Sequence, residues 1–107
     1  RFDALCLDVE DGAAAFVRFA ESLRRGRELG AEVSILKIWM TETAQRVTDL
    51  IVGIAVESGS LDAPIALARG GEVHAANLYF ASRPMTIYGG TSEIQRNILA
   101  KELLKLP

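Results

Sequence analysis

The sequence has few of the residues that disulfide frameworks and metal sites need. One cysteine, Cys6, and one histidine, His74, occur among 107 residues, and no Cys-x-x-Cys pair is present. A single cysteine cannot form an intrachain disulfide. One cysteine and one histidine are also too few ligands for the usual zinc sites. We predict that His74 is a surface or partly buried side chain rather than a metal ligand. Cys6 lies between two leucines and is predicted to be a buried, unreactive thiol.

Strong net charge and long hydrophobic runs are also missing. The formal net charge is −2, so the chain lacks the basic surface that sequence-independent nucleic-acid binding needs. The longest apolar run, residues 50–56, contains Gly53 and is too short to span a membrane. No basic-then-apolar leader is visible, so we expect a cytoplasmic protein. The chain begins with Arg1 rather than Met, which suggests a fragment or a processed chain, and the excess of arginine and alanine suggests a bacterial source.

The chain does have helical periodicity, and half of its residues are hydrophobic. Apolar residues spaced by three or four predict helices over residues 8–25, 31–57, 72–82 and from Thr91 or Ser92 to about Leu106. Glycine and proline mark residues 58–71 and 83–90 as connections. No segment alternates with a period of two. The fold class is therefore all-α, a helical bundle, with residues 1–107 in one domain.

The spacing also predicts which side of each helix is buried. We expect the helix over 31–57 to bury an apolar stripe made of Val33, Leu36, Met40, Ala44, Val47, Ile51 and Ile54. A polar stripe lies on another side, with Lys37, Thr41, Gln45 and Thr48. The last helix should bury Ile94, Ile98, Leu99, Leu103 and Leu106. Asp8 or Asp11 is predicted to cap the first helix, and Trp39 and Met40 serve either core packing or a subunit contact.

Two glycines, Gly89 and Gly90, precede the last predicted helix. Without side chains the backbone can turn sharply and approach a ligand, and a helix N-terminus offers free amides to an anion or a polarised oxygen. Ser92 and Gln95 have the spacing of a capping box, in which the side chain of each residue accepts a hydrogen bond from the backbone amide of the other. The alternative is an ordinary glycine loop that feeds a helix cap, and the local pattern alone favours that alternative.

The longer string favours a specific family. Tyr-Gly-Gly-Thr-Ser-Glu-Ile-Gln-Arg-Asn-Ile-Leu-Ala-Lys, residues 88–101, closely resembles the C-terminal signature of the flavin-dependent acyl-CoA dehydrogenases. Residues 34–37 and 41–45 resemble the long central helix of the family's C-terminal domain, and residues 77–87 resemble the segment that leads into the signature. The resemblance implies an up-down four-helix bundle that follows a helical and a β domain. This chain then represents an incomplete bundle without its first helix, and a fragment of a larger subunit.

The resemblance also implies a reaction and partners. Members of the family remove two hydrogens across the α,β bond of an acyl-CoA thioester: a base takes the α-proton, and FAD takes the β-hydride. Electrons then usually pass to an electron-transfer flavoprotein. The subunit is expected to assemble with like or unlike acyl-CoA dehydrogenase subunits, as a dimer or tetramer. We expect the isolated 107-residue chain to be inactive and to self-associate through an exposed apolar stripe.

Individual roles carry over onto the matching positions. Many relatives have the catalytic glutamate at the position of Gly89, and glycine cannot accept a proton, so this chain supplies no catalytic base. In other relatives the glutamate lies on the preceding bundle helix, outside this chain. Tyr88, Gly89 and Gly90 match substrate-binding positions, and the Gly89 amide matches a donor to the thioester carbonyl. The residues that match the FAD-contacting segment are Thr91, Ser92 and Glu93, although Thr91 could act as a cap alone and Tyr88 could be an ordinary partly buried aromatic.

One segment departs from the family's pattern. In relatives a glutamine followed by two glycines comes after the central helix and approaches the FAD of a neighbouring subunit. Residues 53–57 align with this segment and have neither the glutamine nor the glycine pair. Together with Gly89, this departure supports an alternative function, a non-catalytic helical assembly subunit that pairs with an active dehydrogenase chain.

Overall fold

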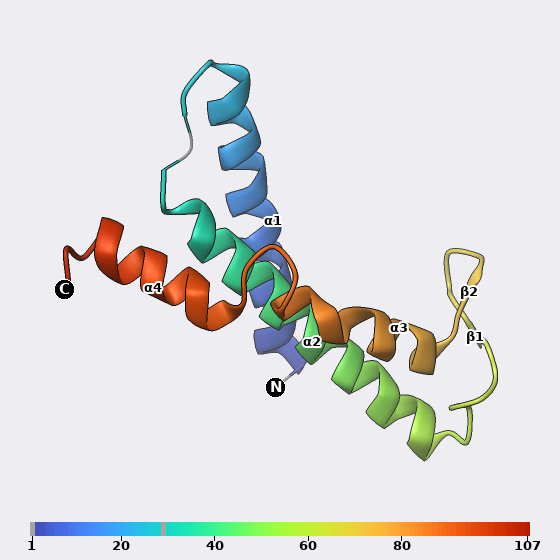
Figure 1. Cartoon of the computed structure of the whole chain (residues 1–107). Helices are drawn as coiled ribbons and strands as arrows, with labels where there is room; N and C mark the ends of the chain where they lie inside the picture. The colour runs from blue at the N-terminus through green and yellow to red at the C-terminus, as the bar shows by residue number, and fades with distance from the viewer. Residues whose placement is uncertain (1, 29) are drawn as a thin grey trace.

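The computed structural model describes residues 2–28 and 30–107, and its helices are arranged around one long central helix. The helices are α1 (Phe2–Arg24), α2 (Val33–Glu57), α3 (Ala75–Ser82) and α4 (Ser92–Glu102), with a short 3-10 helix η1 (Arg83–Thr86) between the last two. Figure 1 shows α2 at the centre, and α1, α3 and α4 all pack against it. The all-α prediction is confirmed.

The first helix begins earlier than the sequence predicted. Residues 2–7 are helical, and Asp3 lies in the first turn, where a carboxylate is favourable. Asp8 and Asp11 therefore lie inside α1, and the prediction that one of them caps this helix is wrong. Asp8 instead joins α1 to α2, because its carboxylate pairs with Arg46 and its carbonyl accepts the indole N–H of Trp39 at 2.8 Å.

A glycine lets α1 and α2 approach each other closely. Gly12 is buried, and a Cβ at this position would lie 2.8 Å from Met40 Sδ and 3.0 Å from Trp39 Cδ1. Glycine inside a helix costs about 1 kcal/mol relative to alanine. The close approach explains its presence here, because a side chain at this position would have to displace the side chains of Met40 and Trp39.

A small hairpin replaces part of the predicted loop and of the predicted third helix. Strand β1 (Ile65–Ala66) pairs antiparallel with β2 (Glu72–Val73), with Ile65 opposite Val73. Gly70 and Gly71 turn the chain with φ of 90° and 83°, values that suit glycine. Helix α3 therefore begins at Ala75, three residues later than predicted from the sequence.

The molecule is open rather than compact. Its radius of gyration is 16.6 Å, whereas a compact chain of this length has about 13 Å. The buried hydrophobic side chains among the described residues are Leu5, Ala55 and Ala75. The predicted apolar stripes of α2 and α4 are only partly covered. The exposed members are Val33, Met40, Ile54, Ile94, Ile98, Leu103 and Leu106, and the half-buried members are Leu36, Ala44, Val47, Ile51 and Leu99.

Polar residues fill much of the interface that the apolar stripes were expected to fill. The buried residues of α2 are Ser34, Thr43, Thr48 and Ala55, and those of α4 are Ser92 and Gln95. Thr48 and Gln45 belong to the polar stripe, and both bond to Ser82, the last residue of α3. Within this chain, α2 thus reaches α3 and α4 partly through its polar side.

Candidate functional site

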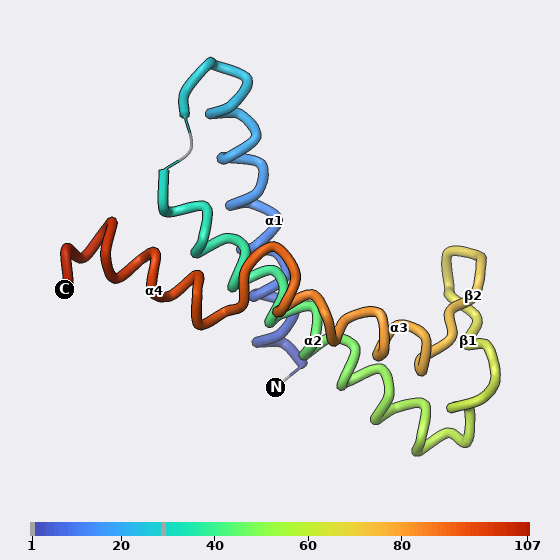
Figure 2. The backbone as a smooth tube through the Cα atoms, viewed as in Figure 1, coloured from blue at the N-terminus to red at the C-terminus, as the bar shows by residue number. Residues whose placement is uncertain are grey.

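The segment between α3 and α4 lies across α2 and carries the glycine pair (Figure 2). Pro84 is the second residue of η1, and its carbonyl accepts the amides of Ile87 and Tyr88 at 2.9 and 3.0 Å. Gly89 and Gly90 follow with φ of 71° and 96°. Consecutive residues in this region favour glycine. The local fold of the loop is thus set by a proline turn followed by a glycine turn.

Gln45 of α2 attaches this segment to the central helix. Its Nε2 lies 3.1 Å from the Ser82 carbonyl oxygen, 3.2 Å from the Arg83 carbonyl oxygen and 3.1 Å from Thr86 Oγ1. All three acceptors belong to the end of α3 or to η1. Gln45 therefore fixes where η1, and the glycine turn after it, lies on α2.

Arg83 reinforces this attachment from the other side. Its guanidinium donates to Asp49 at 2.9 Å and to the Gln45 carbonyl at 3.2 Å. Its Cζ lies 4.2 Å from the centre of the Tyr79 ring, a cation–π geometry. The same helix end is held by a bond of 2.9 Å between the Thr48 and Ser82 hydroxyls.

The two carbonyls of the glycine turn each accept a hydrogen bond from a side chain. Gln95 Nε2 of α4 donates to the Gly89 carbonyl at 2.9 Å, and Lys37 Nζ of α2 donates to the Gly90 carbonyl. Across residues 2–28 and 30–107, no acceptor is found for the backbone amides of Gly89, Gly90 or Thr91. The turn therefore has its carbonyls occupied and three consecutive amides available to a ligand.

Thr91 caps α4, and the predicted capping box is wrong by one residue. Thr91 has the extended conformation of a cap, and its Oγ1 accepts the Ile94 amide at 3.2 Å. Ser92 is consequently the first helical residue, and Gln95 lies one position too late to complete the box. Gln95 turns back to the Gly89 carbonyl instead. The Ser92 hydroxyl is left buried without a hydrogen-bond partner among the described residues.

A polar cavity of about 400 Å³ opens at this end of α4. Its lining residues are Glu42, Gln45, Thr86, Ile87, Thr91, Ser92, Glu93 and Arg96. Glu42 pairs with Arg96 at 2.7 Å, so one carboxylate of the cavity is neutralised by a cation. The predicted cofactor-contacting residues thus line a single cavity, and an unsatisfied buried hydroxyl is among them. Such a hydroxyl favours a polar ligand, because a buried polar atom without a partner is costly.

The three predicted substrate-binding residues lie just outside this cavity. Gly89 adds no side chain to the loop, and a Cβ built on it would meet nothing within 4 Å. Tyr88 is exposed rather than partly buried. The structure places these residues beside the predicted cofactor-contacting residues, and no carboxylate occupies the base position. Their predicted roles stay predictions.

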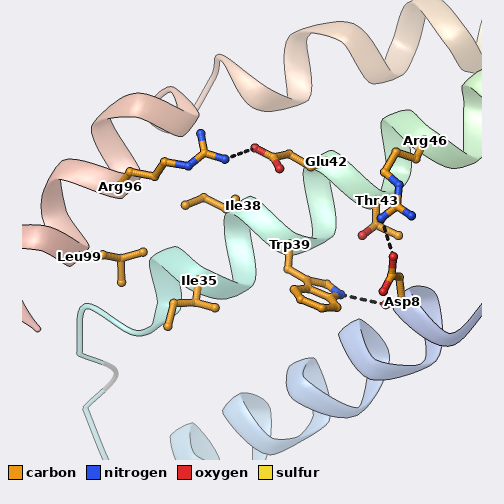
Figure 3. Close-up of a pocket in the computed structure, with 9 residues that line it drawn as sticks. All are labelled: Asp8, Ile35, Ile38, Trp39, Glu42, Thr43, Arg46, Arg96 and Leu99. Atoms are coloured by element: carbon orange, nitrogen blue, oxygen red, sulfur yellow. Dashed lines mark hydrogen bonds and ion pairs between the residues drawn. The ribbon is translucent and has the colours of Figure 1, made fainter. Parts of the chain in front are cut away.

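A second groove lies between α1, α2 and α4 (Figure 3). Its volume is about 380 Å³, and it is lined by Asp8, Ile35, Ile38, Trp39, Glu42, Thr43, Arg46, Arg96 and Leu99. An ion pair lies on each side of the groove. Arg96 of α4 pairs with Glu42 of α2, and Asp8 of α1 pairs with Arg46 of α2. Each charge in the groove is therefore already paired within the chain. Trp39 and Met40 lie against Gly12 in the contact between α1 and α2, and about two fifths of each side chain stays exposed, so packing within this chain and a subunit contact both remain open.

Other reactive groups lie apart from the loop. Cys6 is exposed, so the prediction of a buried thiol is wrong; it lines an apolar groove with Leu5, Val9 and Leu50. His74 is exposed at the residue before α3, as predicted. In the described part of the chain, no cluster of three potential metal ligands occurs. None of the helices described there is both long and apolar enough to cross a membrane.

Sequence reasoning did not identify Lys37, Gln45 or Arg83 as residues that build the site. The available signal was the polar stripe on α2, because Lys37, Gln45 and Thr48 follow one side of an otherwise apolar helix. Polar residues on a helix that is apolar on its other sides need partners. Here the partners are mainly main-chain carbonyls of residues 82–90.

Comparisons with known proteins agree with the motif. A family model described as acyl-CoA dehydrogenase, C-terminal domain, matches residues 4–104. The chain is also similar to a curated protein from Mycolicibacterium smegmatis, acyl-CoA dehydrogenase IpdE1, with 37% identity over 71 residues. That match covers 64% of this chain and 15% of the relative, so the chain corresponds to a small part of that protein's length. No solved structure matches the chain.

Proposed function

The chain belongs to the acyl-CoA dehydrogenase family, as its C-terminal domain, and from this premise we propose that it is part of an FAD-dependent enzyme. The reaction is the α,β-dehydrogenation of an acyl-CoA thioester. The observation that carries the proposal is the turn at residues 89–91, which presents three free amides beside the start of α4. Donors of this kind stabilise negative charge on an oxygen.

The residues at the start of α4 fit a cofactor with many polar oxygens. The buried Ser92 hydroxyl lacks a partner among the described residues, and the first amides of α4, before the capped amide of Ile94, have no intrahelical acceptor. A helix N-terminus of this kind suits phosphate or carbonyl oxygens. We propose that Thr91, Ser92 and Glu93 contact FAD. When bound, FAD would supply the acceptor for the hydride that leaves the β-carbon.

The substrate contacts are proposed on the other side of the same turn. The Gly89 amide would donate to the thioester carbonyl, which gains negative charge as the α-proton leaves. Tyr88 is exposed beside it and would line the acyl group, and Gly90 lets the backbone approach closely. Because Gly89 has no side chain, the base that removes the proton would come from outside these 107 residues.

The proposed partners follow from the family and from the surface. An acyl-CoA is the proposed substrate, an electron-transfer flavoprotein the electron acceptor, and further acyl-CoA dehydrogenase subunits, like or unlike, the assembly partners in a dimer or tetramer. Large exposed apolar surfaces mark such interfaces, and the exposed apolar positions of α1 and α4 are of this kind. A bacterial cytoplasmic location remains a prediction.

A second candidate function is a non-catalytic assembly subunit that pairs with an active dehydrogenase chain. Two observations favour it: glycine occupies the usual base position, and residues 53–57 lack the glutamine and glycine pair. Val56 and Glu57 would also crowd or repel a pyrophosphate at that place. The intact donor turn at residues 89–91 favours the catalytic proposal.

An absorbance spectrum of the full-length protein, purified with any co-encoded partner, separates the two. We expect a yellow flavin band that bleaches anaerobically when one acyl-CoA from a varied set is added. A Ser92→Ala variant should bind FAD more weakly, whereas Ser58→Ala, at an exposed position after α2, should not. A protein that stays colourless with added FAD would refute the catalytic proposal and support the assembly function.

A further inference from the structure

Two side chains from different helices hold the glycine turn by its carbonyl groups. Gln95 on α4 donates to the Gly89 carbonyl, and Lys37 on α2 donates to the Gly90 carbonyl. These residues are 58 positions apart, and Lys37 lies 53 positions from the carbonyl it contacts. Local turn formation does not require a donor from so far away. The tertiary fold therefore adds a constraint that the turn alone lacks.

The consequence for the amides follows from peptide geometry. The described chain has no cis peptide bond, and in a trans peptide the C=O and the N–H point in opposite directions. A donor that fixes the Gly89 carbonyl also fixes the Gly90 amide, and a donor on the Gly90 carbonyl fixes the Thr91 amide. The Gly89 amide is joined to the first held peptide through a single α-carbon. The amides of Gly90 and Thr91 are thus restrained directly, and the Gly89 amide is restrained only through the α-carbon that it shares with the Gly89 carbonyl.

The glycines themselves are matched to this arrangement. A Cβ on Gly90 would lie 2.6 Å from Gln95 Nε2, so the absence of a side chain there leaves room for the Gln95 amide. Gln95 is buried. In such a low-dielectric environment its bond to the Gly89 carbonyl is electrostatically stronger than the same bond would be in water.

Lys37 adds charge to this support. No carboxylate lies within ion-pair distance of its ammonium in residues 2–28 and 30–107. Its bond to the Gly90 carbonyl is therefore charge-assisted and stronger than a neutral one. Polarising a peptide carbonyl also makes the N–H of the same peptide a better donor. Lys37 would raise the donor strength of the Thr91 amide as well as fixing its direction.

We propose that Lys37 and Gln95 are positioning residues, which hold the amides of residues 89–91 in the direction needed to stabilise negative charge on a bound ligand's oxygen. The inference rests on the proposed dehydrogenase function and names the residues that make its donor turn rigid. Neither side chain touches the ligand. Both act through the main chain, since donors aimed in advance need no reorganisation during the reaction.

The test uses the full-length protein with its partner and its flavin. Lys37→Met and Gln95→Met each remove the donor and keep the length of the side chain, and Lys37→Arg keeps a cationic donor. Lys101→Met, at an exposed position in the last turn of α4, is the matched control. The first readout is the rate of anaerobic flavin reduction by the acyl-CoA that bleaches the wild type, measured over a range of substrate concentrations.

We expect each donor-removing variant to lower the limiting rate roughly tenfold with little change in KM, because donor geometry matters most in the transition state. Lys37→Arg should recover most of the rate, and Lys101→Met should match the wild type. The fold-decrease in limiting rate for the double variant should be smaller than the product of the two single fold-decreases, because both residues hold the same turn.

A second readout does not depend on turnover. The enoyl-CoA product of the same acyl-CoA, labelled with carbon-13 at the carbonyl, is bound to the oxidised protein, and its infrared carbonyl stretch is recorded. Hydrogen bonding lowers this frequency. Lys37→Met and Gln95→Met should move the band toward its free-solution position, whereas a merely structural role would leave it unchanged in the molecules that bind.

The outcomes separate this inference from the function on which it rests. A wild type that no acyl-CoA bleaches overturns both. A wild type that is bleached, with Lys37→Met and Gln95→Met unchanged in rate and carbonyl frequency, overturns the positioning roles alone. The role of Lys37 is also overturned if Lys37→Met lowers the rate of flavin reduction, Lys37→Arg does not restore that rate, and the carbonyl band is unshifted.

Discussion

Substituting Gly90 by alanine tests the fit between the glycine turn and Gln95. The left-handed backbone at Gly90 costs an alanine roughly 1–2 kcal/mol. The new Cβ would also lie 2.6 Å from Gln95 Nε2, which belongs to the end of a flexible side chain. Gln95 can move, but it then loses its bond to the Gly89 carbonyl inside a buried environment, at a cost of about 1–3 kcal/mol. The total is about 2–5 kcal/mol.

Gly70 is the matched control. It has φ of 90°, close to the 96° of Gly90, and a Cβ there would meet nothing within 4 Å. Gly70→Ala therefore carries the backbone cost alone. The difference between the two variants isolates the contribution of Gln95, which we place at about 2 kcal/mol.

Amide hydrogen exchange on the full-length protein measures both variants locally. The reporters are the Ile94 and Gln95 amides, which bond to Thr91. In Gly90→Ala the start of α4 should open more often, and about 2 kcal/mol corresponds to exchange about 30-fold faster, at about 1.4 kcal/mol for each factor of ten. In Gly70→Ala, faster exchange should be confined to the hairpin.

The reasoning would be refuted by equal local losses in Gly90→Ala and Gly70→Ala. It would also be refuted if Gly90→Ala cost as much free energy in the Gln95→Ala protein as in the wild type. In the Gly90→Ala/Gln95→Ala protein, the extra cost of the alanine should disappear, because the atom that it displaces is absent.

Three further predictions concern α4, the Arg83 cluster and the isolated chain. Thr91→Ala should destabilise the start of α4 by about 1 kcal/mol, seen as faster exchange of the Ile94 amide, and Thr91→Ser should restore protection. Arg83→Met should lower the melting temperature by a few degrees, because it removes the contacts with Asp49 and Tyr79 at a cost of about 1–2 kcal/mol; an unchanged melting temperature contradicts this. The isolated 107-residue chain should sediment as more than a monomer at micromolar concentration, and a strictly monomeric profile counts against it.

The sequence predicted the existence of the helices better than their ends, because periodic patterns are long and end signals are short. Helix α1 begins at Phe2 rather than near residue 8, and α4 ends at Glu102 rather than near Leu106. The sequence placed the central helix within two residues of α2, Val33–Glu57. The hairpin was missed because two-residue strands are too short to show a period of two. The predicted cap of α4, Ser92, lies one residue after the observed cap, Thr91. Both residue types are good caps, and the backbone angles after Gly90 decide between them.

Burial was predicted less well than helix position, for a physical reason. Periodicity reports which side of a helix is apolar, and it does not say which neighbour that side meets. Within this chain, the contacts of α2 with residues 82–90 use Lys37, Gln45 and Thr48, which periodicity assigned to the polar side. The sequence singled out the glycine pair and the residues around it because a motif constrains composition and order together, and the roles of these residues stay predictions. The side chains that hold the pair come from elsewhere in the chain, and their pairing is a property of the tertiary fold.

The side chains that support the glycine turn bond mostly to main-chain atoms. Gln45, Lys37 and Gln95 bond to carbonyl oxygens, which every residue type provides. The side chains of Ile87 and Tyr88 take no part in these bonds and are exposed. The turn can therefore keep its shape while residues 87 and 88 are exchanged. An engineer, or natural variation, could alter what the loop recognises at these two positions without rebuilding the frame that holds it.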